Sequence, residues 1–395
     1  MFSGINSNVL ILGLVSFLTD VSSEMIYPLL PLFVTSILGA GPAFLGIIEG
    51  VAESTAALLK LLSGVLSDRM QGRKGLILAG YSLSSLSRPL MAIAGSPLFI
   101  LLIRFSDRVG KGIRTSPRDA LIADSTNSSM RGKAFGFHRS LDHAGAIVGP
   151  LLATGLMAWT LSDLRTIFWL AAIPGILAVV LIIVKVRDVP RIKASGTAIP
   201  SLIPPQNIRG YLLVLLLFTL GNSSDVFLLL RASQLGVTPA LIPLLWTFFH
   251  VIKMLSSMPF GALSDRIGRR SLIIIGWLVY ALAYAGFALA TSKLQIWLLF
   301  AWYGLFYGMT EGVEKAYLND LSEAAEIGSS FGWYNFAIGI GALPASVIFG
   351  YIWQKYSPAM AFGFGACLAC MAAMLLLGLR PRHPGLTMAC NRHEP

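Results

Sequence analysis

The chain has 395 residues, of which 55% are apolar and only 12% are charged, and its formal net charge is +11. A soluble globular protein carries about twice that charged fraction, so the composition excludes an ordinary soluble domain. Apolar stretches of about 20 residues recur along the whole chain, each long enough to cross a bilayer as a helix. A membrane β-barrel is excluded as well, because its strands would read as short alternating segments. We therefore expect an all-α integral membrane protein.

Twelve apolar stretches follow one another along the chain, and one long connector rich in Pro and basic residues divides them into two sets of six. We expect 1–187 to form an N-terminal half, 188–209 a cytoplasmic linker, 210–383 a C-terminal half and 384–395 a cytoplasmic tail. The predicted spans are 8–37, 43–67, 75–94, 97–121, 133–158, 165–186, 210–233, 239–263, 271–290, 294–318, 329–352 and 359–380.

Lysine and arginine gather in every second loop, whereas the alternate loops hold only single basic residues, at Arg165, Lys293 and Lys355. The positive-inside rule then places both termini in the cytoplasm. This pattern explains the net charge without a nucleic-acid partner. We expect a multi-pass protein of the cell membrane, such as a bacterial inner membrane, and see no cleavable signal peptide at the N-terminus.

Four short segments of the first half recur in the second half in the same order, at a nearly constant offset of about 200 residues. Gly64-Val-Leu-Ser-Asp68-Arg69 recurs as Gly261-Ala-Leu-Ser-Asp265-Arg266, and the triplet ending at Glu24 recurs as the triplet ending at Asp225. Collinear matches of this kind indicate a duplicated six-helix unit. Parallel repeats in transporters place the substrate between the halves, near the middle of the membrane.

The repeated loop resembles the signature loop of the major facilitator superfamily, and its second copy continues to Gly268-Arg269-Arg270. The first copy departs from the pattern by one inserted residue before Arg73. The resemblance implies the twelve-helix major facilitator fold, a drug/proton-antiporter-like branch, and a monomer in the lipid bilayer. It also implies a conformational latch, for which the candidates are Gly64, Asp68, Arg69, Arg73, Gly261, Asp265, Arg266, Gly268 and Arg269. A purely topogenic basic loop is the alternative.

The fifth span carries Gly145-Ala-Ile-Val-Gly149-Pro150-Leu-Leu-Ala153, which resembles the exporter-associated motif of the superfamily with Ala in place of its last Gly. Small residues four apart permit close helix packing, and a proline inside a helix bends it. We expect a bend at Pro150 and favour export or antiport, with generic helix packing as the alternative.

The fourth span is unusually basic. Arg104, Arg108, Lys111 and Arg114 fall on one helical stripe about 120° wide, and Gly110 and Gly112 leave room beside it for a ligand or a neighbouring backbone. Ionisable residues inside a span usually face a cavity or a partner. We expect this stripe to bind an anionic or zwitterionic solute, or alternatively to pair with carboxylates across helices. Further candidates for substrate binding are Asp20, Tyr27, Trp246 and Tyr307.

Several carboxylates lie inside other spans, where withdrawal from water makes a carboxyl group hold its proton more strongly. They are candidates for taking up and releasing a proton during transport, and structural pairing is the alternative for each. The proton-coupling candidates are Glu24, Glu53, Asp225, Glu311 and Glu314.

The sequence contains no nucleophile elbow, no phosphate-binding Gly-Lys-Ser/Thr loop and no zinc helix motif, so we expect neither an enzyme nor a bound cofactor or metal. The Cys367-x-x-Cys370 pair sits in an apolar span and is interpreted as packing. The leading hypothesis is a proton-coupled exporter of a small organic or amphiphilic solute with anionic character. The alternatives are a proton symporter that takes up an organic anion, a lipid or lysolipid flippase, and a sensor that keeps the fold.

Overall fold

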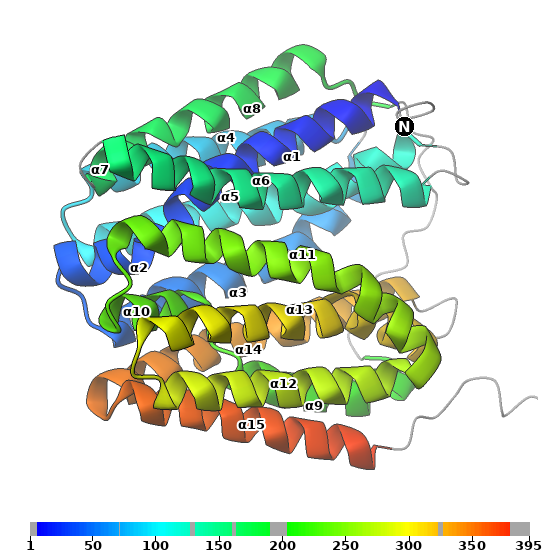
Figure 1. Cartoon of the computed structure of the whole chain (residues 1–395). Coiled ribbons are helices and arrows are strands. Elements are labelled where there is room, and N and C mark those ends of the chain that lie inside the picture. Colours follow the sequence, from blue (N-terminus) through cyan, green and yellow to red (C-terminus); the bar gives the residue numbers. More distant parts are fainter. Residues whose placement is uncertain are drawn as a thin grey trace, which may run out of the picture.

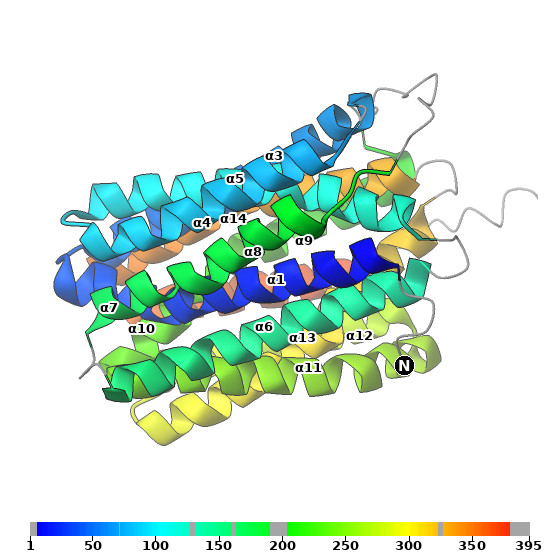
Figure 2. The ribbon, with the colours of Figure 1, turned by 90° about the horizontal axis from the view of Figure 1, so that it is seen from above.

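The computed structural model describes residues 6–70, 72–126, 131–159, 163–189, 204–322 and 327–379. All regular elements in these ranges are helices. The long helices run roughly side by side along one direction, and two groups of them lie one above the other (Figure 1, Figure 2). The all-helical architecture predicted from composition is confirmed.

The first half of the chain forms six membrane-length segments, two of which are composite. The first segment contains α1 (Ser7–Ile26), η1 (Tyr27–Leu29), α2 (Leu30–Leu32) and the π-helical turn η2 (Phe33–Ile37), followed by α3 (Pro42–Arg69), α4 with η3 (Lys74–Leu90, Met91–Ile93), α5 (Pro97–Asp124), α6 (Arg131–Trp159) and the pair α7 and α8 (Leu164–Leu170, Ala172–Lys185).

The second half repeats this plan with six further segments. They are the pair α9 and α10 (Gln206–Gly221, Val226–Gln234), η5 with α11 (Pro239–Leu241, Ile242–Ile267), α12 (Arg269–Leu289), α13 (Lys293–Leu321), α14 (Ile327–Lys355) and α15 (Pro358–Gly378). The twelve segments match the predicted spans to within about one helical turn.

Three predicted spans are interrupted. The first leaves α-helical geometry where Pro28 and Pro31 remove backbone donors, and the sixth breaks at Ala171. The seventh opens after Gly221, where Asn, Ser and Ser are poor helix formers, so that Asp225 becomes the residue just before α10. Glu24, its repeat partner, instead stays inside α1.

Hydropathy separates the twelve segments into two classes. Nine are long and apolar enough to cross a membrane by length and composition. The other three, α3, α5 and α13, are as long but more polar. Since a polar side chain inside a membrane is costly unless it faces protein or water, these three helices are expected to line an interior site.

The two halves meet along two seams. One is the long contact between α3 and α14, and the other is the contact between α6 and α11. At the first seam the Ser54 hydroxyl donates to the Gly339 carbonyl at 2.6 Å, and Gln354 Oε1 accepts from the Ala43 amide at 3.1 Å. These bonds hold α3 and α14 together and leave the room for a cavity between the other helices.

The glycine motif of the fifth span packs α6 tightly onto α1. A Cβ at Gly145 would lie 2.9 Å from Asp20 Cβ, and one at Gly149 would lie 2.9 Å from Glu24 Cβ, with α1 carbonyls closer still. The helix is continuous through Pro150, and no break interrupts it there. The motif therefore positions the turn of α1 that carries two of the candidate carboxylates.

Replacing Gly149 by leucine is expected to destabilise the protein by on the order of 1–3 kcal/mol, because the extra side chain must force α1 away. Gly155→Leu on the same helix is the matched control, since nothing lies within 4 Å of a Cβ there. Thermal unfolding of the two purified variants in detergent measures the difference. Equal losses of stability would show that α1 and α6 are not in close contact at Gly149.

Candidate functional site

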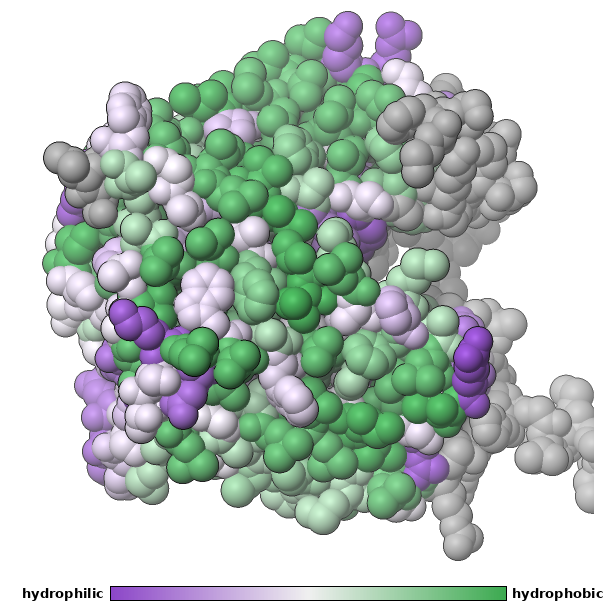
Figure 3. Space-filling view, in the orientation of Figure 1, coloured by the Kyte–Doolittle hydropathy of each residue, from purple (hydrophilic) through white to green (hydrophobic). Residues whose placement is uncertain are grey.

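Two adjoining cavities lie between the halves and share Asp20, Lys111 and Arg114 in their walls. The larger, of about 410 Å³, extends along α5 and α6 toward Arg118 and Arg139. The smaller, of about 210 Å³, lies deeper, against Tyr27 and Trp246. Figure 3 shows the molecule hollowed between the halves on the side of the N-terminus, with hydrophilic side chains inside the hollow.

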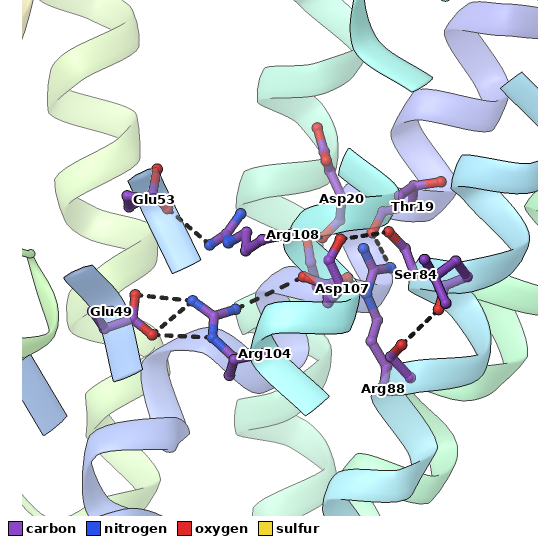
Figure 4. A network of polar contacts seen from close by, with 12 residues as sticks. Thr19, Asp20, Glu49, Glu53, Ser84, Arg88, Arg104, Asp107 and Arg108 are labelled. Carbon is purple, nitrogen blue, oxygen red and sulfur yellow. Dashed lines mark hydrogen bonds and ion pairs between the residues drawn. The ribbon is translucent and has the colours of Figure 1, made fainter. Parts of the chain in front are cut away.

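The basic stripe of α5 is largely neutralised by carboxylates of the same half (Figure 4). Both Arg104 Nε and Nη2 donate to Glu49, at 2.7–3.0 Å, and Arg108 Nη2 lies 3.1 Å from Glu53 Oε1. Glu49 is fully buried, so its charge depends on Arg104 for compensation. The stripe is thus not a bare anion-binding wall.

A second pair extends this network to α4. Arg88 Nε lies 3.3 Å from Asp107 Oδ1, and Arg88 Nη1 donates to the Thr19 carbonyl at 2.9 Å (Figure 4). Asp107 is also 3.9 Å from Arg104 Nη1. This chain of charges ties α1, α3, α4 and α5 into one rigid body on the floor of the smaller cavity.

Three cations of the cavity walls stand outside these pairs. Within the described part of the chain, no carboxylate lies at ion-pair distance from Lys60, Lys111 or Arg114. The Arg114 guanidinium instead donates to the Ser84 hydroxyl and covers the Tyr81 ring at 4.4 Å. Lys111 faces both cavities, which makes it the most available cation of the stripe.

The glycines of the stripe make room for helices and not for a ligand. A Cβ at Gly110 would lie 2.5 Å from the Gly80 carbonyl oxygen of α4, and one at Gly112 would lie 2.4 Å from Leu59 Cβ of α3. Close packing on both flanks fixes the rotation of α5. The basic stripe consequently points at the cavities.

The second half contributes its own charges to the site. Asp225 Oδ1 accepts from the Tyr303 hydroxyl at 2.6 Å, and the Tyr307 hydroxyl lies 3.4 Å from Asp225 Oδ2. Lys253 Nζ lies 2.8 Å from Glu311 Oε2 and 4.4 Å from the centre of the Tyr307 ring. This wall is therefore part acidic and part aromatic.

Glu314 occupies a different place. Its carboxylate accepts from Trp277 Nε1 at 3.0 Å and from the Tyr334 hydroxyl at 2.8 Å, inside the C-terminal half. It lines neither of the two cavities. Its surroundings are those of a carboxylate that holds helices α12, α13 and α14 together.

One hydrogen bond crosses between the halves beside the smaller cavity. Trp246 Nε1 of α11 donates to Glu24 Oε2 of α1 at 2.8 Å. The Tyr27 ring packs on the Trp246 ring with 5.4 Å between centroids. No cation lies at ion-pair distance from Glu24, Asp20 or Asp225 among the residues that the structure describes.

The two signature loops make equivalent contacts in the two halves. Arg73 lies 2.9 Å from Asp124 at the end of α5, and Arg269 pairs with Asp320 at the end of α13. Gly268 has φ +90°, a backbone conformation that favours glycine. Gly64 and Gly261 have room around them, Asp265 and Arg266 are exposed, and the side chains of Asp68 and Arg69 lie outside the described residues.

The residue inserted in the first loop has a structural consequence. Asp188, at the start of the connector, accepts from the backbone amides of Arg73 and Lys74 at 2.7 and 2.9 Å. A Cβ at Gly72 would lie 2.6 Å from the Asp188 carboxylate. The connector therefore caps α4, and the altered loop provides the room for it.

Most candidates from the sequence meet at this one site. The residues that line at least one cavity are Asp20, Glu24, Tyr27, Glu53, Arg104, Arg108, Lys111, Arg114, Asp225, Trp246 and Glu311. Tyr307 is one contact away through Asp225, and Glu314 is outside. Arg88 and Lys253 were missed, although a single charge inside an apolar span marks both. Among the described residues, no group of three metal-binding side chains is placed to hold an ion.

The comparisons with known proteins agree with this architecture. The model of the Major Facilitator Superfamily matches residues 12–230 and 211–391. The chain belongs to the major facilitator superfamily. It is therefore a membrane transporter and not an enzyme.

Individual relatives cover nearly the whole chain. An uncharacterized MFS-type transporter of Methanocaldococcus jannaschii is 37% identical over 94% of this chain and 95% of the relative. The multi-drug resistance efflux pump PmrA of Streptococcus pneumoniae is 26% identical over 89% of this chain and 92% of the pump. The crystal structure of the nucleoside transporter NupG shares the fold, with a TM-score of 0.78, 13% identity, and coverage of 94% and 99%.

Proposed function

We propose that this superfamily member is a proton-coupled exporter that carries a small polar solute with anionic character by alternating access. The observation that carries the proposal is the hydrogen bond from Trp246 to Glu24, which joins the two halves beside the cavity at a carboxylate without a cation partner in the described chain. A group that both titrates and closes one end of the cavity can couple proton binding to reorientation.

The direction of opening follows from the charged loops. The larger cavity extends toward the ends of α5 and α6, at the end of the molecule where the basic loops gather. By the positive-inside rule that end is cytoplasmic, together with both termini. We therefore interpret the structure as an inward-facing state in which Glu24, Trp246 and Tyr27 help to close the outer side.

Export is favoured over uptake by two observations. Gly145 and Gly149 pack α6 directly on the turn of α1 that carries Asp20 and Glu24, so the exporter-associated motif is part of the coupling site. PmrA, a relative over most of the chain, is named as an efflux pump. Symport into the cell is the competing mechanism, and the sign of solute-driven proton movement in inverted vesicles separates the two.

Glu24→Gln is expected to remove the pH dependence of the opening. Protonation weakens the acceptance of the Trp246 hydrogen bond, so acidification should release the outer closure and protect the inner cavity. A single cysteine at Ala146, introduced after Cys367, Cys370 and Cys390 are replaced, reports this as slower maleimide labelling at acidic pH. A cysteine at exposed Lys293 corrects for the pH dependence of the reaction itself.

Glu314→Gln is the matched comparison, because it removes a buried carboxylate that lines neither cavity. It should keep the pH response of the Ala146 reporter, whereas Glu24→Gln should flatten it. A pH response that survives in Glu24→Gln and disappears in Glu314→Gln would move proton coupling from the seam into the C-terminal half.

A further inference from the structure

The charges that line the two cavities balance in an unusual way once the ion pairs are set aside. Three cations remain without a carboxylate at ion-pair distance in the described chain, on α3 and α5: Lys60, Lys111 and Arg114. Three carboxylates remain without a cation at that distance, on α1 and just before α10: Asp20, Glu24 and Asp225. The unpaired wall is therefore neutral overall but has two oppositely charged sides.

We propose that these cavities recognise a small zwitterion, whose anionic group is held by Lys111 with Lys60 and Arg114, and whose cationic group is held by Asp20 with Glu24 and Asp225. This inference rests on the proposed transport function and names its substrate class. Asp20 and Lys111 line both cavities, so both poles of a ligand at the junction are within the wall.

The energetics of desolvation favour a zwitterion over other solutes. An apolar drug would strip water from unpaired charges and return no hydrogen bonds, which is costly for each charge. A simple anion would compensate the cations but leave the carboxylates unpaired and facing a like charge. A zwitterion replaces the lost water at both sides without burying net charge. The cavity walls are accordingly polar, unlike the mostly apolar linings of drug sites.

Calorimetric titration of the purified full-length protein in detergent tests this with ligands that differ only in charge. The zwitterions are glycine, 4-aminobutanoate and 6-aminohexanoate, which separate the two poles by increasing lengths, and the single-charge counterparts are butanoate and butylamine. At least one zwitterion is expected to bind about tenfold or more tightly than either counterpart. Phosphoethanolamine, compared with β-alanine of similar length, tells whether the anionic pole is a phosphate or a carboxylate.

Variants assign the two poles. Lys111→Gln should abolish the preference for a zwitterion over butylamine, and Asp20→Asn should abolish the preference over butanoate. Lys293→Gln, an exposed lysine on α13, should change neither preference. The titration of the unmodified protein decides the matter even if a variant fails to fold.

The proposal is overturned if butanoate or butylamine binds as tightly as every zwitterion, or if no zwitterion binds. It is also overturned if Lys111→Gln and Asp20→Asn leave both preferences intact. These results would leave the proton-coupling proposal standing as long as the Ala146 reporter keeps its Glu24-dependent pH response. Loss of that response with zwitterion preference retained would have the opposite meaning.

Discussion

Glu49→Gln is expected to destabilise the protein by about 3–5 kcal/mol, because it leaves the Arg104 guanidinium buried without its main counter-charge. Glu49 has no exposed surface, and the Arg104 side chain is 6% exposed. Asp107, the other carboxylate near Arg104, is 3.9 Å away and already lies against Arg88. Unfolding of the variant in detergent by SDS titration gives the loss of free energy.

Two comparisons show whether burial is the cause. Glu311→Gln breaks the Lys253–Glu311 pair, whose side chains are 15% and 36% exposed, and should cost no more than about 1 kcal/mol. Replacing Glu49 and Arg104 together by methionine should recover most of the stability lost in Glu49→Gln, since no lone charge then stays buried. A double variant as unstable as the single one would contradict this account.

Arg269→Gln is expected to slow the exchange between inward- and outward-facing states by about tenfold, equivalent to about 1.4 kcal/mol in the barrier. Arg269 pairs with Asp320 and lies 3.6 Å from Asp265, so it connects the ends of α11, α12 and α13. Its stability cost should remain below about 1 kcal/mol, since the pair is partly exposed. A large kinetic effect with a small stability effect is what a conformational latch predicts.

Dyes on cysteines at Thr126 and Ser322, just after α5 and α13, report the separation of the halves in single molecules. Arg270→Gln is the matched control, because Arg270 donates to the carbonyls of Leu376 and Leu377 on α15 and has no carboxylate partner in the described chain. Equal slowing in the two variants would mean that the loop acts through general packing, and the latch proposal would then fail.

The duplicated sequence produces equivalent latches but unequal walls. Arg73 with Asp124 and Arg269 with Asp320 are repeat mates that form the same contact in both halves. In contrast, Glu24 is in an unbroken helix, whereas its mate Asp225 follows a break and accepts from Tyr303. A transporter of two equal walls could not hold two unlike charges, so this divergence is where specificity arises.

The sequence alone determined the membrane spans, their number, the repeat and the charged helices. These properties depend on local hydropathy and on residue order, and the spans were predicted to within about a turn. Even the importance of Gly145 and Gly149 was readable, because small residues four apart form a flat strip on any helix. What they pack against was not readable.

Only the tertiary structure decided which charges are paired. A helical wheel shows that Arg104, Arg108 and Lys111 share a face of α5, but the height and rotation of α3 decide that Glu49 and Glu53 meet the two arginines and that Lys111 meets no carboxylate in the described chain. Such contacts join residues more than 50 positions apart and depend on sub-turn shifts between packed helices. For this reason the basic stripe predicted an anion site, whereas the folded protein presents a neutral wall with two charged sides.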